Sequence, residues 1–192
     1  MVASLKKPAE ETGSGKPSLI HVGLGGPKKL RMRAMLMFCT YAFLTAFCFS
    51  TWIPVMAQYA LTFHLSGISQ TALYFYNPII VFIFALPIGI MAAKMDFKNV
   101  MVLGSVLLFT GTGIKAIPVQ VLESTPLIHI GTAIQGVCFA VMYLGIPIIS
   151  ATWFKPGLRT IPTAFITSSI AFGLATAFAA IPPIIDGNSA LM

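Results

Sequence analysis

Sixty consecutive residues of this chain, from Ala34 to Ala93, contain no Lys, Arg, Asp or Glu. A transmembrane helix uses about 20 apolar residues to cross a hydrocarbon core about 30 Å thick. The run is therefore long enough for two crossings. Arg33 precedes it and Lys94 follows it, and a hairpin of two helices returns both flanks to the same side of a membrane.

The overall composition agrees with a membrane location. Only 9% of the 192 residues are charged and 57% are hydrophobic, whereas about a quarter of the residues in a soluble protein are charged. The chain is predicted to be an integral, multi-pass membrane protein whose first partner is the lipid bilayer. Its net charge of +7 does not indicate a nucleic-acid partner, because the basic residues cluster at the ends of apolar runs, as determinants of membrane topology do.

Enzyme chemistry has no visible basis in the sequence. The three cysteines, Cys39, Cys48 and Cys138, lie inside apolar runs, where thiols behave as small buried hydrophobic groups. They predict neither a disulfide framework nor a metal site. There is no paired carboxylate, no histidine set with metal spacing and no nucleophile with a base nearby, so neither an enzyme nor a bound cofactor is expected.

The apolar runs predict an all-α membrane protein with five transmembrane helices. Pro54 is expected to break the first helix, and Ser66 or Ser69 to cap the second. Pro182 and Pro183 are expected to end the last. The predicted helices cover residues 34–57, 70–93, 99–117, 126–154 and 160–181.

Small residues are expected to let neighbouring helices approach closely. In the third predicted helix these are Gly104, Gly111 and Gly113. In the fifth they form a stripe at four-residue spacing, made up of Ala171, Ala175 and Ala179.

The charges and the apolar runs divide the chain into three parts. Residues 1–33 are polar and lack apolar periodicity, which predicts a disordered, basic, cytosolic tail. Residues 34–183 form the five-helix transmembrane bundle, and residues 184–192 a short outer C-terminal end. With a cytosolic N-terminus, eleven of the twelve basic residues lie inside, as the positive-inside bias requires. Only Lys115 lies outside, where it is expected to pair with Glu123.

Four stretches resemble one branch of the major facilitator superfamily, solute carrier family 49. This branch contains the feline leukaemia virus subgroup C receptor proteins and the disrupted-in-renal-carcinoma proteins, and the resemblance covers residues 34–183. The stretches are Thr51-Trp-Ile-Pro54, Gly111-Thr-Gly-Ile-Lys-Ala-Ile-Pro118, Leu127-Ile-His129, and Thr152-Trp-Phe-Lys-Pro-Gly-Leu-Arg-Thr160 running into Pro162-Thr-Ala-Phe.

The resemblance implies a carrier fold. Members of the superfamily have two six-helix halves with a solute site between them. This chain matches only helices one to five, so the sixth helix and the second half are expected to be absent from it. A partner is then implied, either the missing C-terminal half or another membrane subunit, together with a small organic solute.

One loop departs from the family pattern. Between helices two and three the family places an Asp, a basic residue, a Gly and further basic residues, which form a gating cluster. Here Ala93 stands in the place of the Asp, Lys94 holds the basic place, Asp96 takes the place of the Gly, and Lys98 follows. The turn is expected to survive, because Asp tolerates unusual backbone angles better than most residues.

The resemblance also bears on the substrate, because relatives in the branch are associated with choline, ethanolamine, haem and pyridoxine. An aromatic cage attracts a quaternary ammonium through the ring quadrupole. The Trp and the Gln that choline-carrying relatives use correspond to Phe49 and Ala171 in this chain. The resemblance therefore does not by itself predict choline as the substrate of this chain.

Six residues are candidates for contact with a solute. Phe49 and Trp52 lie one turn apart in the first helix. Trp52 is interpreted either as an aromatic residue that lines a cavity or as a lipid-facing, core-packing or interfacial residue. An amide inside a membrane needs a partner, which is either solute or another helix. Gln135 and Tyr143, two turns apart, are expected to share a face. The complete set is Phe49, Trp52, Tyr76, Asn77, Gln135 and Tyr143.

Two functions remain open at this point. The first is transport of a small organic solute that is choline-, pyridoxine- or haem-like, as part of a major facilitator carrier. The second is a truncated, non-transporting membrane protein that assembles with other membrane proteins or regulates them. The membrane itself is either the plasma membrane or that of the lysosome.

Overall fold

The computed structural model describes residues 28–62, 65–116 and 125–189. These residues form helices and connecting turns, and the described part contains no strand. The elements, in chain order, are α2 (Lys28–Ser50), the 3-10 helix η1 (Ile53–Val55), α3 (Met56–Thr62), α4 (Gly67–Lys94), α5 (Phe97–Ala116), α6 (Thr125–Trp153), the 3-10 helix η3 (Pro156–Leu158) and α7 (Thr160–Ser189). Five of the helices are long and apolar enough to cross a membrane, as predicted.

The ends of the outermost helices differ from the prediction. Helix α2 begins at Lys28, so the last six residues of the predicted tail are helical. Lys, Arg, Leu and Met are all good helix formers, and they continue the helix beyond the apolar run. Helix α7 passes through Pro182 and Pro183 and ends at Ser189. Proline is tolerated inside membrane helices when the freed carbonyls find other donors, so the pair does not end α7 as expected.

The predicted break at Pro54 is confirmed. Helix α2 ends at Ser50, and the chain passes through η1, which contains Pro54, before α3 begins. Proline has no backbone N–H and its ring crowds the preceding turn. The first helix able to span a membrane, α2, is therefore followed by a bend and the short helix α3, with Trp52 at the bend.

The start of α4 also agrees with the sequence. Ser66 has an extended backbone, and its Oγ accepts a hydrogen bond from the backbone N–H of Ser69 at 3.2 Å. This bond satisfies one of the free donors that every helix N-terminus carries. Ser66, one of the two predicted caps, is therefore the one used. His64, which lies between the first two predicted helices, falls outside the described residues.

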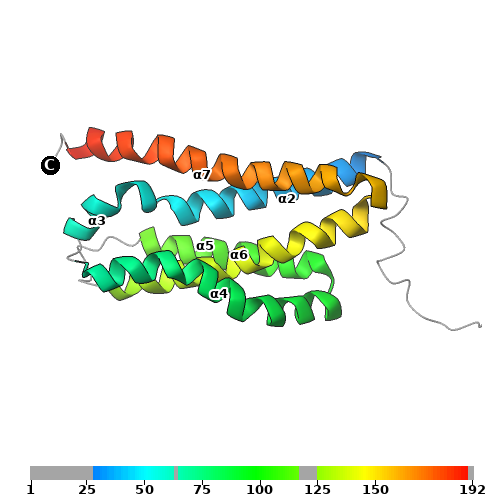
Figure 1. The fold of residues 1–192 in the computed structure, drawn as a ribbon, viewed down its shortest axis with the longest axis horizontal. Helices are drawn as coiled ribbons and strands as arrows, with labels where there is room; N and C mark the ends of the chain where they lie inside the picture. The colour runs from blue at the N-terminus through cyan, green and yellow to red at the C-terminus, as the bar shows by residue number, and fades with distance from the viewer. Residues whose placement is uncertain (1–27, 63–64, 117–124, 190–192) are drawn as a thin grey trace, which may run out of the picture.

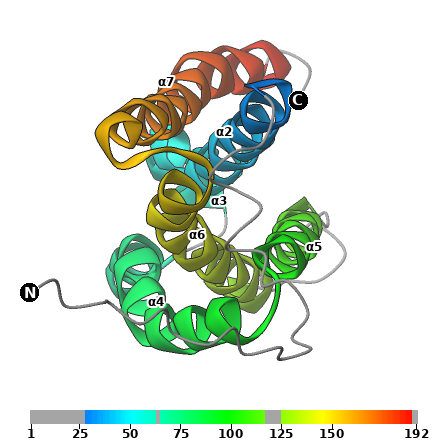
Figure 2. The same cartoon turned by 90° about the vertical axis from the view of Figure 1, so that its right-hand side faces the viewer.

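Helix α6 lies at the centre of the bundle (Figure 2). It contacts α2, α4, α5 and α7. Figure 1 shows α2 and α7 side by side on one side of α6, with α4 and α5 on the other. The start of α2 and the end of α4 lie at the same end of the molecule, which confirms the predicted hairpin.

Close helix contacts on α5 depend on two of its three predicted glycines. A Cβ at Gly104 would lie 2.6 Å from Tyr41 Oη, and one at Gly111 would lie 3.0 Å from the Gly131 carbonyl oxygen. The Tyr41 hydroxyl donates across the bundle to the carbonyl oxygen of Cys138 at 3.2 Å. Gly113 has nothing within 4 Å of a Cβ position and takes no part in this packing.

The alanine stripe predicted for α7 does not pack within the described bundle. Ala171, Ala175 and Ala179 are exposed, and the face of α7 that contacts α2 contains Gly173 instead. A Cβ at Gly173 would lie 2.5 Å from the carbonyl oxygen of Phe43 on α2. The stripe was assigned from spacing alone, which does not specify which face of a uniformly apolar helix is covered.

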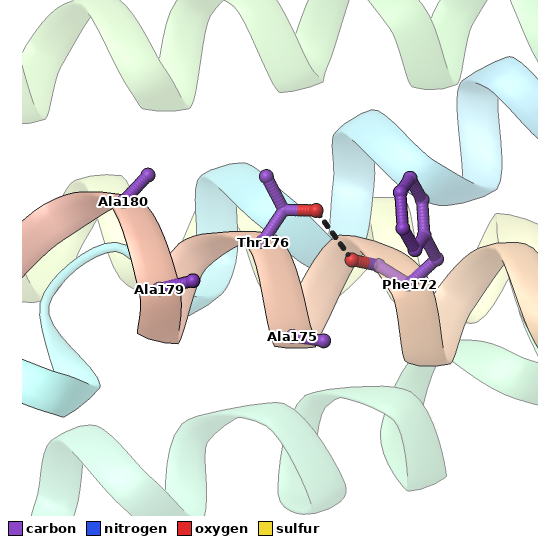
Figure 3. Close-up of a pocket in the computed structure, with 5 residues that line it drawn as sticks. All are labelled: Phe172, Ala175, Thr176, Ala179 and Ala180. Carbon is purple, nitrogen blue, oxygen red and sulfur yellow. Dashed lines mark hydrogen bonds between the residues drawn. The ribbon is translucent and has the colours of Figure 1, made fainter.

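Two alanines of the stripe line a shallow groove on α7 (Figure 3). The lining residues are Phe172, Ala175, Thr176, Ala179 and Ala180. The only hydroxyl among them, that of Thr176, donates to the Phe172 carbonyl oxygen at 2.7 Å, so it is used within the helix. The groove is consequently an apolar surface without an available polar group.

Candidate functional site

Five aromatic side chains form a continuous line across the bundle from α4 to α6. The ring of Tyr74 on α4 lies edge-on to Trp52, with centroids 4.9 Å apart. Trp52 contacts Phe49 of α2 at 6.1 Å, and Phe49 contacts Phe139 of α6 at 5.0 Å, both edge-on. Phe139 then meets Tyr143 at 5.9 Å. We call these five residues the aromatic line.

The aromatic line is buried in its middle and open at both ends. Trp52, Phe139 and Phe49 are 2%, 3% and 6% exposed, whereas Tyr74 and Tyr143 are 47% and 46% exposed. Tyrosine offers both a ring face and a hydroxyl to a molecule arriving at either end. The line thus joins two partly open positions through the packed contact of α2 with α6.

The bend between α2 and η1 leaves two polar atoms without a hydrogen-bond partner in the described part of the chain. These are Ser50 Oγ and Trp52 Nε1. Ser50 is fully buried. A buried polar group without a partner costs roughly 1–3 kcal/mol. The two atoms therefore have unused hydrogen-bonding capacity beside the aromatic line.

Tyr76 and Asn77, both predicted candidates, lie on the part of α4 that faces α6. The Tyr76 ring meets the His129 ring edge-on at 5.6 Å. Asn77 Oδ1 and His129 Nδ1 are buried, and neither has a partner among the described residues. This contact lies apart from the aromatic line, because no ring pair joins it to Tyr74 in the part of the chain that the structure describes.

The structure does not bring Gln135 and Tyr143 together. Gln135 is fully buried, where its Oε1 accepts from Lys115 Nζ at 3.0 Å and its Nε2 donates to Thr112 Oγ1 at 2.9 Å. Two helical turns leave residues eight apart about 80° out of register, so Gln135 faces α5 while Tyr143 continues the aromatic line. Glu123, the predicted partner of Lys115, lies outside the described residues.

The loop between α4 and α5 is a tight, exposed turn. Met95 is extended after the last residue of α4, and the backbone N–H of Asn99 donates to the Asp96 carbonyl oxygen at 2.8 Å. Lys94, Asp96 and Lys98 are all exposed. Within the described residues these three make no ion pair. The predicted gating residues are therefore neighbours in sequence that are not held together by salt bridges.

Sequence reasoning did not single out Phe139 or Ser50. Phe139 links the two helices of the site, and the available signal was its four-residue spacing from Tyr143 on α6. Ser50 had no distinctive pattern, because a serine in an apolar run usually bonds back to its own helix. Ala171, the position expected to correspond to the family glutamine, is exposed on α7, and no residue of α7 belongs to the aromatic line.

Comparison with known proteins places this geometry in context. The family model described as Major Facilitator Superfamily matches residues 7–188. The curated proteins "Solute carrier family 49 member 4 homolog" of Xenopus tropicalis and of Xenopus laevis are 28% and 27% identical over 172 residues. Each alignment covers 86% of this chain but 37% of the relative, so the chain spans little more than a third of their length. No solved structure matches it.

Proposed function

This chain belongs to the major facilitator superfamily, and we propose that it forms one wall of the solute path in a membrane carrier. The solute is a small organic molecule of the choline-, pyridoxine- or haem-like class. Carriers of this superfamily bind solute near the midplane, between two halves that rock against each other. The relatives matched here are solute carrier homologs, which supports transport as the function.

The aromatic line is the observation that carries the proposal. A cation binds over aromatic faces, and a flat ring stacks on them or meets them edge-on. Tyr74 and Tyr143 expose such surfaces at the two ends of the line. Choline-like, pyridoxine-like and haem-like molecules each present a cation or a flat ring, and so match these surfaces.

Polar recognition is assigned to the bend and to α4. Trp52 Nε1 and Ser50 Oγ offer donors beside the line, and Asn77 Oδ1 offers an acceptor on α4. Tyr76 supports Asn77 from the neighbouring position by contacting α6 through His129. Gln135 does not contact the solute in this proposal. It holds α5 against α6 through its hydrogen bonds to Lys115 and Thr112. The exposed loop of Lys94, Asp96 and Lys98 serves as the gate at one end.

The second wall of the path comes from another polypeptide segment. We assign it to a C-terminal half, or to a separate membrane subunit that replaces it, because the alignments leave most of each relative's length unmatched. We place the N-terminus on the cytosolic side of a plasma or lysosomal membrane. The basic residues at the start of α2 and beside Lys94 favour that orientation.

Direct binding tests the proposal. The purified chain in lipid nanodiscs is titrated with radiolabelled choline, pyridoxine and haem, and saturable binding of one of them is expected. Trp52→Phe retains a ring but removes the indole N–H, and it is expected to weaken that binding about tenfold. Phe82→Ala removes an aromatic ring that is 85% exposed on α4 and serves as the matched control. Equal affinities in these two variants would contradict the proposed site, and a lack of saturable binding by the unaltered chain would contradict this solute class.

A further inference from the structure

One end of the bundle gathers basic residues from three separate segments of the chain. The start of α2, the turn between α4 and α5, and the turn between α6 and α7 all lie there (Figures 1 and 2). Figure 2 is viewed from this end. We call it the basic end, and its basic residues are Lys28, Lys29, Arg31, Arg33, Lys94, Lys98, Lys155 and Arg159.

The charges of the basic end are not balanced within the described residues. Eight basic residues are present there against a single acidic one, Asp96. Seven of the eight are exposed, and Arg31 is partly exposed. None of them forms an ion pair in the described part of the chain. Arg159 Nε donates only to the backbone carbonyl oxygen of Phe154, at 3.5 Å. A surface of this kind attracts an anionic partner.

Large apolar side chains are exposed among these charges in every one of the three segments. Leu30 and Met32 alternate with the basic residues of α2 and are 44% and 52% exposed. Met95 follows Lys94 and is 47% exposed, and Leu158 precedes Arg159 and is 45% exposed. Apolar and basic side chains side by side are typical of protein that lies in a membrane interface, where the former enter the acyl boundary and the latter meet head groups.

We propose that the basic end binds the head groups of anionic phospholipids in the leaflet that surrounds it. The phosphate and carboxylate groups of the lipid neutralise the eight cations, and the acyl chains cover Leu30, Met32, Met95 and Leu158. A soluble polyanion satisfies the charges but leaves those apolar side chains in water, so the combination favours lipid. The three segments belong to different helices, and bound lipid therefore bridges α2 to the two turns.

The two tryptophans of the chain provide the means of testing this. Trp153 ends α6 at the basic end, whereas Trp52 lies at the bend toward the opposite end (Figure 1). A Trp52→Phe background leaves Trp153 as the only tryptophan. Its fluorescence is measured in phosphatidylcholine vesicles that contain the same fraction of either brominated phosphatidylserine or brominated phosphatidylcholine. Bromine quenches only a tryptophan that the labelled lipid touches.

Brominated phosphatidylserine is expected to quench Trp153 at least about twice as strongly as brominated phosphatidylcholine, since each cation near an anionic surface strengthens attraction about fivefold. Replacing Lys94, Lys98, Lys155 and Arg159 with Gln removes four of the eight cations and should lower the ratio clearly below that of the parent protein. Replacing the three lysines with Arg instead retains the charge and should retain the preference. Unchanged quenching by brominated phosphatidylcholine shows that each variant is inserted and folded.

Three results would overturn the proposal. The first is equal quenching by the two lipids in the parent protein, and the second is a serine-lipid preference that the Gln substitutions leave undiminished. The third uses competitors: glycerophosphoserine, which is the head group without acyl chains, or polyglutamate. If either removes the lipid preference at low millimolar concentration while vesicles remain intact, the basic end recognises a soluble anion or an acidic protein segment rather than lipid.

Discussion

The Nζ atom of Lys115 on α5 donates a 3.0 Å hydrogen bond to Oε1 of Gln135 on α6. The Gln135 amide also donates to Thr112 Oγ1 at 2.9 Å, so a single buried side chain joins α5 to α6 at two points. A Cβ at Gly131 would lie 2.6 Å from Lys115 Cγ. Gly131 therefore provides the space through which the lysine side chain reaches across α6.

Replacing Gln135 with Ala is expected to destabilise the bundle by about 1–3 kcal/mol, because Lys115 and Thr112 lose their partner inside the protein. Removing both polar groups together, with Lys115→Met and Gln135→Leu, should cost less than the two single changes added. Unfolding in mixed micelles with increasing dodecyl sulfate measures the free energies. Thr110→Ala, at an exposed position, is the control. Additive effects of Lys115→Met and Gln135→Leu would show that the hydrogen bond contributes nothing.

Gly104→Ala is expected to destabilise the protein by about 1–3 kcal/mol through overpacking. The new methyl group would lie 2.6 Å from Tyr41 Oη and 3.1 Å from Val141 Cγ1. Adding Tyr41→Phe removes the closer atom and should recover part of the loss. Gly113→Ala, where a Cβ meets nothing within 4 Å, should be neutral or slightly stabilising. The same unfolding assay compares the variants, and equal effects of the two glycine changes would contradict this packing.

Gly173→Ala is expected to disturb the pairing of α7 with α2 more severely. Its Cβ would lie 2.5 Å from a backbone atom, the Phe43 carbonyl oxygen, which cannot move aside by changing rotamer. We expect α2 and α7 to separate at this level. A spin-label pair at the exposed positions Leu44 and Leu174 would report a longer distance than in the parent protein. Gly89→Ala, with open space around it, should leave that distance unchanged.

The sequence was sufficient to predict the membrane-crossing segments. Charge-free runs specify which residues can enter a bilayer, and basic clusters specify where helices turn. The ends were less predictable, because α2 continues through a basic stretch and α7 through Pro182 and Pro183. Local signals for a helix stop are overridden where the surroundings hold the chain helical.

The candidate site was predictable only in part. Phe49 and Trp52 could be singled out chiefly through the resemblance to the family, and both take part in the aromatic line. The eight-residue spacing of Gln135 and Tyr143 did not reveal that Gln135 packs against α5 whereas Tyr143 joins the aromatic line. Which helix covers each face of a central helix depends on the tertiary arrangement, which spacing does not specify. Helix α6 contacts four helices, so more than one of its faces is covered. The recognised family is confirmed by the match over residues 7–188.

The most direct measurement of the central claim, that the aromatic line borders a solute path, is uptake in cells that make the protein from its own gene. Tyr143→Ala and the control Phe82→Ala are introduced separately at that gene, and uptake of radiolabelled choline and pyridoxine is followed with protein amount held equal. The account predicts that Tyr143→Ala lowers uptake of one of these solutes about tenfold or more, while Phe82→Ala leaves it unchanged. Equal uptake in the two variants would contradict the account.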